Sequence, residues 1–163
     1  MAKEKQISIN IIPLATKNIS SIPKYQTVGS SGIDLSASPD ISDKGMIIKP
    51  GCREIIPTGI AIELPENLEA QIRPRSGLAY KYGITVLNSP GTIDSDYRGE
   101  IKIILINHGQ KDFLILPGDR VAQMVFSKVE KVKLIDKKEL SITTRGSRAV
   151  SYTHLTLPTI CSV

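Results

Sequence analysis

Four short segments of the chain concentrate glycine, serine, aspartate and arginine, the residue types that bind phosphate groups and metal ions. They are, in chain order, Ser31–Ala37, Arg73–Ala79, Asn88–Glu100 and Pro117–Met124. In the first segment a glycine closely precedes Asp34 at the start of an expected strand, where a carboxylate can hold Mg²⁺ directly or through water. The same pattern is common in plain turns, so this segment decides nothing by itself.

The second segment offers the donors that an anion needs. Arg75 carries a planar, fully charged guanidinium, and Ser76 adds a hydroxyl. If a short helix begins there, the backbone N–H groups of Ser76 and Gly77 can point at an anion. The sequence contains no G-x-x-x-x-G-K-[ST] pattern, so such a cradle would differ from a P-loop. In isolation, an arginine-capped turn explains the segment equally well.

The third segment is the densest in reactive side chains. Asp94 and Asp96 lie two positions apart, and either carboxylate can orient a water molecule as a general base. Tyr97 beside them can stack on a ring, and Gly91 lets backbone groups approach a planar ligand edge. Because the segment lies between two strand patterns, we expect a long β-hairpin. An acidic surface hairpin without a ligand is the alternative.

The fourth segment completes a set that favours attack on a phosphoryl group. Gly118 and Asp119 predict a turn into a strand from which Gln123 can donate to a ligand oxygen. Covalent catalysis is disfavoured, because His108 lies in a predicted turn without a serine partner. Cys52 has no histidine neighbour to activate it.

The composition fits a globular chain that binds an anion. The 163 residues suit one domain, and 40% of them are hydrophobic and 23% charged. The net charge of +5 fits either a plain basic surface or an anion site. Nucleic-acid binding is disfavoured, because aromatic residues make only 4%, tryptophan is absent and Lys128–Lys138 is the one dense basic run. No C-x-x-C pattern or His/Cys cluster indicates structural zinc.

The termini and the cysteines predict the location. Residues Met1–Asn10 lack the apolar run of a secretory signal, and no stretch approaches the roughly 20 apolar residues of a membrane helix. Cys52 and Cys161 cannot form a disulfide framework. We therefore expect a cytoplasmic, reducing location and no membrane partner.

Strand patterns dominate the elements that must position the four segments. Alternating or β-rich runs, bounded by glycine and proline, occupy Ile7–Ile11, Ile60–Leu64, Ile101–Leu105, Leu114–Leu116 and Val121–Val129. These runs predict an all-β sandwich, jelly roll or barrel. Only Gly77–Tyr82 and Lys137–Leu140 show brief helical patterns, and no window offers the crossover helices of a parallel sheet.

The last 14 residues differ in kind from the rest of the chain. Residues Val150–Thr159 back-translate to GTC TCT TAT ACA CAT CTG ACG CTG CCG ACG, which resembles the reverse read of a transposon-type sequencing adapter. We therefore expect a β domain over residues 1–148 and a non-native tail over residues 149–163. This interpretation removes the tail from any site hypothesis.

The four segments, in this order and at this spacing, resemble the motifs of the trimeric dUTP diphosphatases (dUTPases). The strings Gly-Thr-Ile-Asp-Ser-Asp-Tyr-Arg-Gly-Glu and Pro-Arg-Ser-Gly-Leu-Ala carry most of the resemblance, which spans about residues 7–148. It implies a distorted jelly-roll or β-barrel subunit in a homotrimer, with active sites at the subunit interfaces. It also implies hydrolysis of dUTP to dUMP and pyrophosphate with Mg²⁺, which limits uracil incorporation into DNA and supplies dUMP for dTMP synthesis.

The resemblance also implies roles for individual residues. Asp94 would be the general base that orients the water attacking the α-phosphate, and Asp34 would hold Mg²⁺ through water. Tyr97 would stack under the deoxyribose and leave no room for a 2′-hydroxyl. The other implied substrate-binding residues are Arg75, Ser76 and Gly77 from a neighbouring subunit, Gln123, Asn88, Thr92, Ile93 and Lys102 around the uracil, and Arg145 on the γ-phosphate.

The chain departs from the family pattern at its end. Thr144–Arg148 resembles the start of the C-terminal motif that closes the site, but the adapter-like tail replaces the rest, including an aromatic that would stack on uracil. We therefore expect folding and trimer formation with impaired turnover. The alternatives are a dCTP deaminase, which shares the fold, a non-catalytic trimeric module that binds nucleotide or protein, and a nucleic-acid binder.

Overall fold

The chain folds mainly as β-strands, as its apolar alternation predicts. A computed structural model describes residues 7–17 and 22–148, and these contain eleven strands and one helix. The elements are β1 (Asn10–Pro13), β2 (Ile33–Ser36), β3 (Met46–Ile48), β4 (Arg53–Pro57), β5 (Ile60–Glu63), β6 (Leu68–Arg73), α1 (Ser76–Tyr82), β7 (Ile84–Val86), β8 (Gly91–Ile93), β9 (Lys102–Asn107), β10 (Phe113–Ile115) and β11 (Arg120–Lys128).

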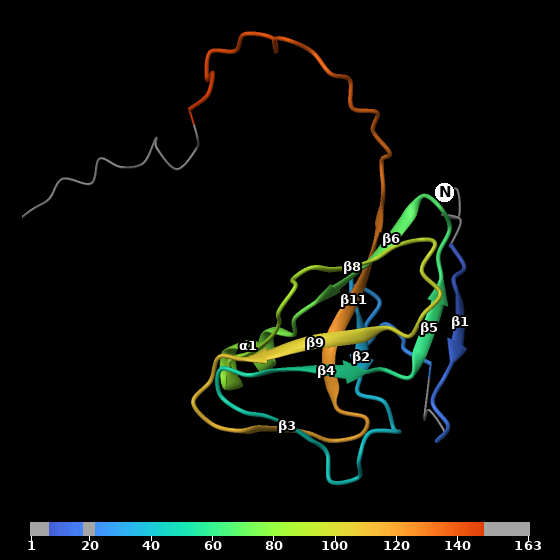
Figure 1. The fold of residues 1–163 in the computed structure, drawn as a ribbon. Coiled ribbons are helices and arrows are strands. Elements are labelled where there is room, and N and C mark those ends of the chain that lie inside the picture. The colour runs from blue at the N-terminus through green and yellow to red at the C-terminus, as the bar shows by residue number, and fades with distance from the viewer. Residues whose placement is uncertain (1–6, 18–21, 149–163) are drawn as a thin grey trace, which may run out of the picture. The chain divides into compact units, whose positions relative to one another are not determined.

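The strands form four small antiparallel sheets (Figure 1). The largest has the order β2-β11-β6-β8, and a second has the order β4-β9-β7. Two pairs, β1 with β5 and β3 with β10, complete the set. This confirms the all-β prediction, although in the described part of the chain the sheets do not join into one closed barrel.

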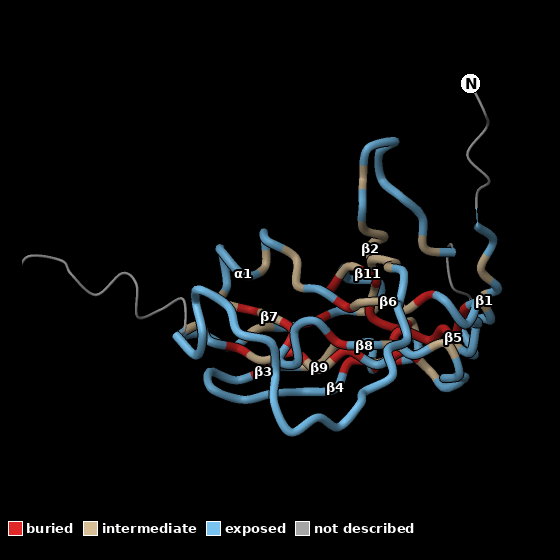
Figure 2. Tube along the Cα trace, turned by 90° about the horizontal axis from the view of Figure 1, so that it is seen from above, coloured by how far each residue is buried: buried red, intermediate tan, exposed pale blue. Residues whose placement is uncertain are grey.

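The core lies between the sheets and is aliphatic (Figure 2). Alternation works as predicted in β9, where Ile103 and Leu105 are buried while Ile104 and Ile106 face outward and are partly exposed. The largest fully buried side chains are Leu35, Ile48, Ile56, Ile84, Ile101, Ile103, Leu105, Ile115, Val121 and Asn107.

Most of the predicted elements are confirmed, with shifted ends. The helix predicted at Gly77–Tyr82 is α1, which ends at Gly83. Gly83 adopts the left-handed conformation (φ 70°), and a Cβ there would lie 2.6 Å from the amide nitrogen of Gly109, so only glycine fits. The strand predicted from Ile7 begins only at Asn10, because pairing with β5 starts there.

The predicted long hairpin across the third segment is confirmed. The two strands that flank the segment, β7 and β9, pair antiparallel, with Val86 opposite Leu105. Within the loop between them, β8 pairs with β6 of another sheet. The connection over residues 94–101 therefore crosses from one sheet to the other. Alternating apolar residues identify strands, but they did not predict the partner of β8.

The chain divides into two compact units, Met1–Glu130 and Lys131–Val163. All the described strands belong to the first unit. Residues 131–148 of the second unit contain neither helix nor strand, so the helical pattern at Lys137–Leu140 was misleading. The adapter-like tail lies outside the described residues. Within the described ranges, no helix has both the length and the apolar character to cross a membrane.

The pKa of Asp40, three positions after the end of the first segment, is clearly lowered. Its carboxylate accepts hydrogen bonds from the backbone N–H groups of Lys17 and Thr16, at 2.8 and 2.6 Å, and these bonds hold the pKa of Asp40 below its usual value. Lys17 also pairs with Asp43 at 2.8 Å. These contacts fasten the segment after β1 to the loop between β2 and β3.

Asn107 is the buried polar side chain on which we expect stability to depend most. Its Nδ2 donates to the carbonyl oxygens of Ile48 and Lys111, both at 2.8 Å, and its Oδ1 accepts from the N–H of Gly109 at 2.8 Å. Asn107→Ala leaves these groups unpaired in the interior, so we expect the free energy of unfolding to fall by about 2–4 kcal/mol in urea denaturation. His108→Ala, one position along and exposed, is the control and should change it by less than about 0.5 kcal/mol.

Candidate phosphate-binding site

Two arginine side chains from separate segments contact Asp34 of the first segment. Arg75 Nε lies 3.1 Å from Asp34 Oδ1, and Arg120 Nη1 lies 3.0 Å from Asp34 Oδ2. Arg75 Nη1 also donates to the backbone carbonyl of Arg120 at 2.9 Å. The Asp34 side chain is 16% exposed and the Arg75 side chain 27% exposed, so both remain accessible at the surface. One carboxylate thus orients two guanidinium groups beside each other, with net charge +1.

A β-bulge brings Arg120 into this group. Gln123 pairs with Asp34 across β11 and β2, and Arg120 pairs with Ser36, with a register shift between Arg120 and Ala122. In a regular strand, residues three positions apart point to opposite faces. The extra residue in the bulge places Arg120 and Gln123 on the same face as Asp34.

Arg120 is therefore a functional candidate that the sequence analysis missed. Its only signal was its position in the Pro-Gly-Asp-Arg turn of the fourth segment. Period-two alternation would have assigned it to the face opposite Gln123, and sequence alone does not reveal the bulge.

A polar cavity of about 300 Å³ lies against this face. Its walls include Ser30, Ser31, Asp34, Arg73 and Gln123. Gln123 pairs directly with Arg73 of β6 as well as with Asp34 of β2, so β11 holds the two flanking strands together here.

Gln123 is held in place, and a glycine makes room for it. Its Nε2 donates to the carbonyl of Pro74 at 3.0 Å, which fixes the side chain against the end of β6. A Cβ at Gly32 would lie 2.5 Å from Gln123 Oε1, so the glycine of the first segment is needed for close approach.

The second segment forms the predicted helix start. Arg75 is the N-cap residue of α1, and its carbonyl accepts the N–H groups of Leu78 and Ala79, both at 3.1 Å. The first N–H groups of a helix have no partner within it, and here these belong to Ser76 and Gly77. Both residues are exposed and follow Arg75 directly, so two backbone N–H donors lie close to a positively charged residue.

The third segment occupies a different part of the first unit. Asp94 and Tyr97 lie in an exposed turn after β8, where the N–H of Tyr97 donates to the carbonyl of Asp94 at 3.2 Å. Arg98 in this turn reaches Glu63 of β5 at 3.5 Å. The turn therefore lies beside β5, whereas α1 lies at the other side of the same unit (Figure 1).

Strand register gives the size of this separation. Ile93 pairs with Ala70 of β6, and Arg75 lies five positions after Ala70 in the sequence, beyond the end of β6. At about 3.3 Å per residue, Asp94 and Arg75 of the chain are roughly 15–20 Å apart. The chain by itself therefore does not bring the third segment to the arginine cluster.

The remaining predicted site residues are placed as follows. Asn88 lies in the loop before β8, and a Cβ on Gly91 would be 3.2 Å from its Nδ2. Thr92 and Ile93 belong to β8, and Lys102 begins β9. Arg145 belongs to the second unit, where its Nε donates to the carbonyl of Arg148 at 2.8 Å in a local turn.

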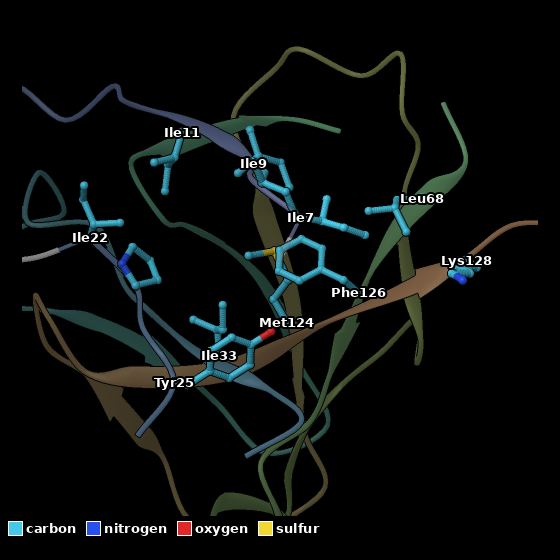
Figure 3. Close-up of a pocket in the computed structure, with 12 residues that line it drawn as sticks. Ile7, Ile9, Ile11, Ile22, Tyr25, Ile33, Leu68, Met124, Phe126 and Lys128 are labelled. Atoms are coloured by element: carbon cyan, nitrogen blue, oxygen red, sulfur yellow. The ribbon is translucent and has the colours of Figure 1, made fainter. Parts of the chain in front are cut away.

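A larger cavity, of about 830 Å³, has the wrong chemistry for an anion (Figure 3). Most of its lining is apolar, with side chains from the N-terminal segment and from β11, such as Ile9, Met124 and Phe126. Among the residues that the structure describes, Lys128 is the one charged residue in its lining. The polar cavity beside Asp34 is therefore the better candidate for binding phosphate.

Together, the fold and the site define an all-β protein in which two arginines are held at Asp34, beside a polar cavity. A sequence model of the dUTPase family matches residues 18–154. A deoxyuridine 5′-triphosphate nucleotidohydrolase of Neorickettsia sennetsu is 60% identical over 126 residues, which cover 77% of this chain and 83% of that protein. One of Syntrophotalea carbinolica is 46% identical over 149 residues, covering 91% and 98%. The chain belongs to the dUTPase family.

Solved structures support the fold at low sequence identity. A variant of the dUTPase of Staphylococcus bacteriophage 80alpha, solved with dUpNHpp, matches with a TM-score of 0.76 and 19% identity over 91% of this chain and 99% of that one. A dUTPase variant of phage phi11 of S. aureus, described with a structural Mg(II) ion, matches with a TM-score of 0.69 and 19% identity over 82% and 98%. These likenesses establish the fold.

Proposed function

We propose that this chain hydrolyses dUTP to dUMP and pyrophosphate. The observation that carries the proposal is the Asp34–Arg75–Arg120 cluster beside a polar cavity, in a chain of the dUTPase family. Two oriented guanidinium groups suit the charge of a triphosphate and can stabilise the charge that develops during phosphoryl attack.

In this proposal the second and fourth segments bind the phosphates. Arg75 supplies charge, Ser76 and Gly77 supply donors at the start of α1, and Gln123 adds an amide from β11. Arg145 extends the set to the γ-phosphate. We add Arg120, because it shares Asp34 with Arg75.

The third segment would carry the reacting water and the specificity. Asp94 acts as the general base, and an exposed carboxylate needs only to be ionised near neutral pH to do so. Tyr97 lies against the deoxyribose. The uracil edge is bound by Asn88 and by backbone groups near Thr92, Ile93 and Lys102.

Magnesium fits the site only together with the nucleotide. Mg²⁺ commonly uses one or two carboxylates, several waters and substrate phosphates, and each oxygen of Asp34 retains a lone pair after its bond to an arginine. In the described residues no group of three or more His, Cys, Asp or Glu side chains could hold a metal alone. When bound, Mg²⁺ would neutralise charge on the phosphate oxygens.

We therefore expect Mg²⁺ alone to give no saturable binding in calorimetry, because Arg75 and Arg120 oppose a free cation at Asp34. With the non-hydrolysable analogue dUpNHpp present, Mg²⁺ should bind, and Asp34→Asn should weaken that binding about 10- to 100-fold. Asp96→Asn removes a carboxylate from the exposed turn after β8 and serves as the control. Tight binding of Mg²⁺ without nucleotide would contradict the proposed arrangement.

A homotrimer accounts for the separation of Asp94 from Arg75. In this arrangement Arg75, Ser76 and Gly77 of one subunit meet Asp94 and Tyr97 of its neighbour. The outer face of the β4-β9-β7 sheet is a suitable contact surface, because Ile55 pairs with Ile104 there and Ile55 is 55% exposed. Such an exposed apolar face is typical of a subunit interface.

Two further interpretations remain predictions. The adapter-like tail would replace the closing arm of the site, so turnover by this chain should be slow until a Gly/Phe-rich arm follows Arg148. The second of these predictions is a cytoplasmic location.

The direct test is pyrophosphate release with Mg²⁺ from dUTP, dTTP, dCTP and UTP. Release from dUTP alone supports the proposal. If nothing is released, the same assay is repeated with a Gly/Phe-rich arm added after Arg148. Activity that appears only with the arm supports the predicted role of the tail, whereas continued inactivity contradicts hydrolysis.

A further inference from the structure

Tyr97 is held in place although it lies at the surface. Its side chain is 45% exposed, yet its hydroxyl donates to the backbone carbonyl of Glu100 at 2.9 Å. Its ring lies directly over Gly99, where an added Cβ would be 2.6 Å from Tyr97 Cζ and 3.0 Å from Cε2. The ring is therefore supported both at its hydroxyl and at the backbone beneath it.

Glu100 connects this support to the rigid part of the subunit. Its Oε1 accepts the N–H of Gly59 at 2.8 Å, in the turn between β4 and β5. Its Oε2 lies 3.7 Å from Lys102 Nζ, and its side chain is 23% exposed. Gly59 has φ 71°, and a Cβ there would lie 2.9 Å from Ser38 Oγ, so the turn that receives Glu100 is itself tightly packed.

The residue after Glu100 strengthens the same attachment. The N–H of Ile101 donates to the carbonyl of Ile60 at 2.9 Å, and the hydroxyl of Thr58 donates to the carbonyl of Ile101 at 2.6 Å. Ile101 is fully buried. The turn that carries Tyr97 is therefore anchored at Glu100 and Ile101 to a turn of the core.

We propose that Gly99 and Glu100 are positioning residues that fix the Tyr97 ring and thereby set the preference for a deoxyribose over a ribose. The inference rests on the proposed function and deepens it. A ring that excludes a 2′-hydroxyl by steric contact works only if it does not move aside, because a displaced ring leaves space for the extra oxygen. Because Gly99 has no side chain, the Tyr97 ring can pack against the backbone there. The anchored Glu100 supplies the carbonyl that accepts the hydrogen bond from the Tyr97 hydroxyl.

Gly99→Ala is the sharpest test, because the added methyl meets the far end of the Tyr97 side chain. The ring can move without unfolding the turn, so the melting temperature should stay within about 2 °C of the parent. We expect the ratio of kcat/KM for dUTP to kcat/KM for UTP to fall about 10- to 100-fold. Gly29→Ala is the matched control, since a Cβ there has nothing within 4 Å.

Tyr97→Phe tests the hydroxyl separately. It keeps the ring but removes the bond to the carbonyl of Glu100, so the same ratio should fall by a smaller factor, about 3- to 10-fold. If Gly99→Ala and Tyr97→Phe both keep the parent ratio within about twofold while the parent prefers dUTP, the positioning role is overturned. A parent enzyme that does not hydrolyse dUTP, even with the arm restored, would instead overturn the proposed function.

Discussion

Asp94→Asn is expected to lower kcat for dUTP hydrolysis by about 10²- to 10⁴-fold, the range that a positioned general base contributes. The substitution keeps the size of the side chain but removes the charge that orients and deprotonates the water. Asp94 is exposed in the turn after β8, so we expect the free energy of unfolding to change little. Pyrophosphate release at saturating dUTP measures the effect.

The matched control for this prediction is Asp96→Asn. Asp96 lies two positions away in the same exposed turn, and the sequence pattern by itself allowed either carboxylate to act. We expect kcat to change less than about twofold in this variant. Binding of dUpNHpp, measured by calorimetry with Mg²⁺, should survive in Asp94→Asn. If kcat falls equally in the two variants, neither carboxylate alone activates the water. If kcat is unchanged in Asp94→Asn, Asp94 is not the general base.

Mixing two inactive variants is expected to restore activity. Arg75→Ala removes the guanidinium beside Asp34, and Asp94→Asn removes the base. Each variant alone should lose at least about 10²-fold in kcat/KM. If every site takes Arg75 from one subunit and Asp94 from the next, random co-assembly of equal amounts leaves about a quarter of the sites with both residues intact.

Co-expression with two different affinity tags isolates the mixed assemblies for this measurement. The control is co-expression of two tagged copies of Asp94→Asn, which should remain inactive. Every isolated mixed trimer has one site of three with both residues intact, so recovery near a third of parental activity supports a site shared between subunits. Mixed assemblies as inactive as the single variants would mean that both residues act within one subunit, against the separation of roughly 15–20 Å that strand register gives.

The arrangement around Asp34 explains why the four segments are spaced so far apart in the sequence. β2, β6 and β11 are adjacent strands of one sheet, so the first, second and fourth segments reach the same edge. The third segment leaves the same sheet on β8 and continues into the β4-β9-β7 sheet. The sheet order therefore separates the proposed base from the phosphate-binding arginines within one chain.

Much of this protein could be predicted from local chemistry. Alternation in Ile101–Leu105 and the strand formers of Val121–Val129 predicted β9 and β11, because half-buried strands need apolar residues at every second position. Gly118 adopts a left-handed conformation at a predicted turn, since such φ values are accessible mainly to glycine. The four motif segments predicted a phosphate site because their residue types bind anions wherever they meet.

Only the tertiary structure decided which of these residues meet. Strand pairing depends on side chains distant in the sequence, so nothing local predicted that β8, inside the loop of the β7–β9 hairpin, pairs with β6. The bulge in β11 moved Arg120 onto the face of Asp34, which reverses what regular alternation implies. In the sequence, Asn107 and Glu100 are ordinary polar residues. In the structure, Asn107 is buried and donates to the carbonyl of Ile48, and Glu100, which accepts the N–H of Gly59, supports Tyr97. Residue types therefore determined the chemistry available to the chain, and long-range packing determined where that chemistry is assembled.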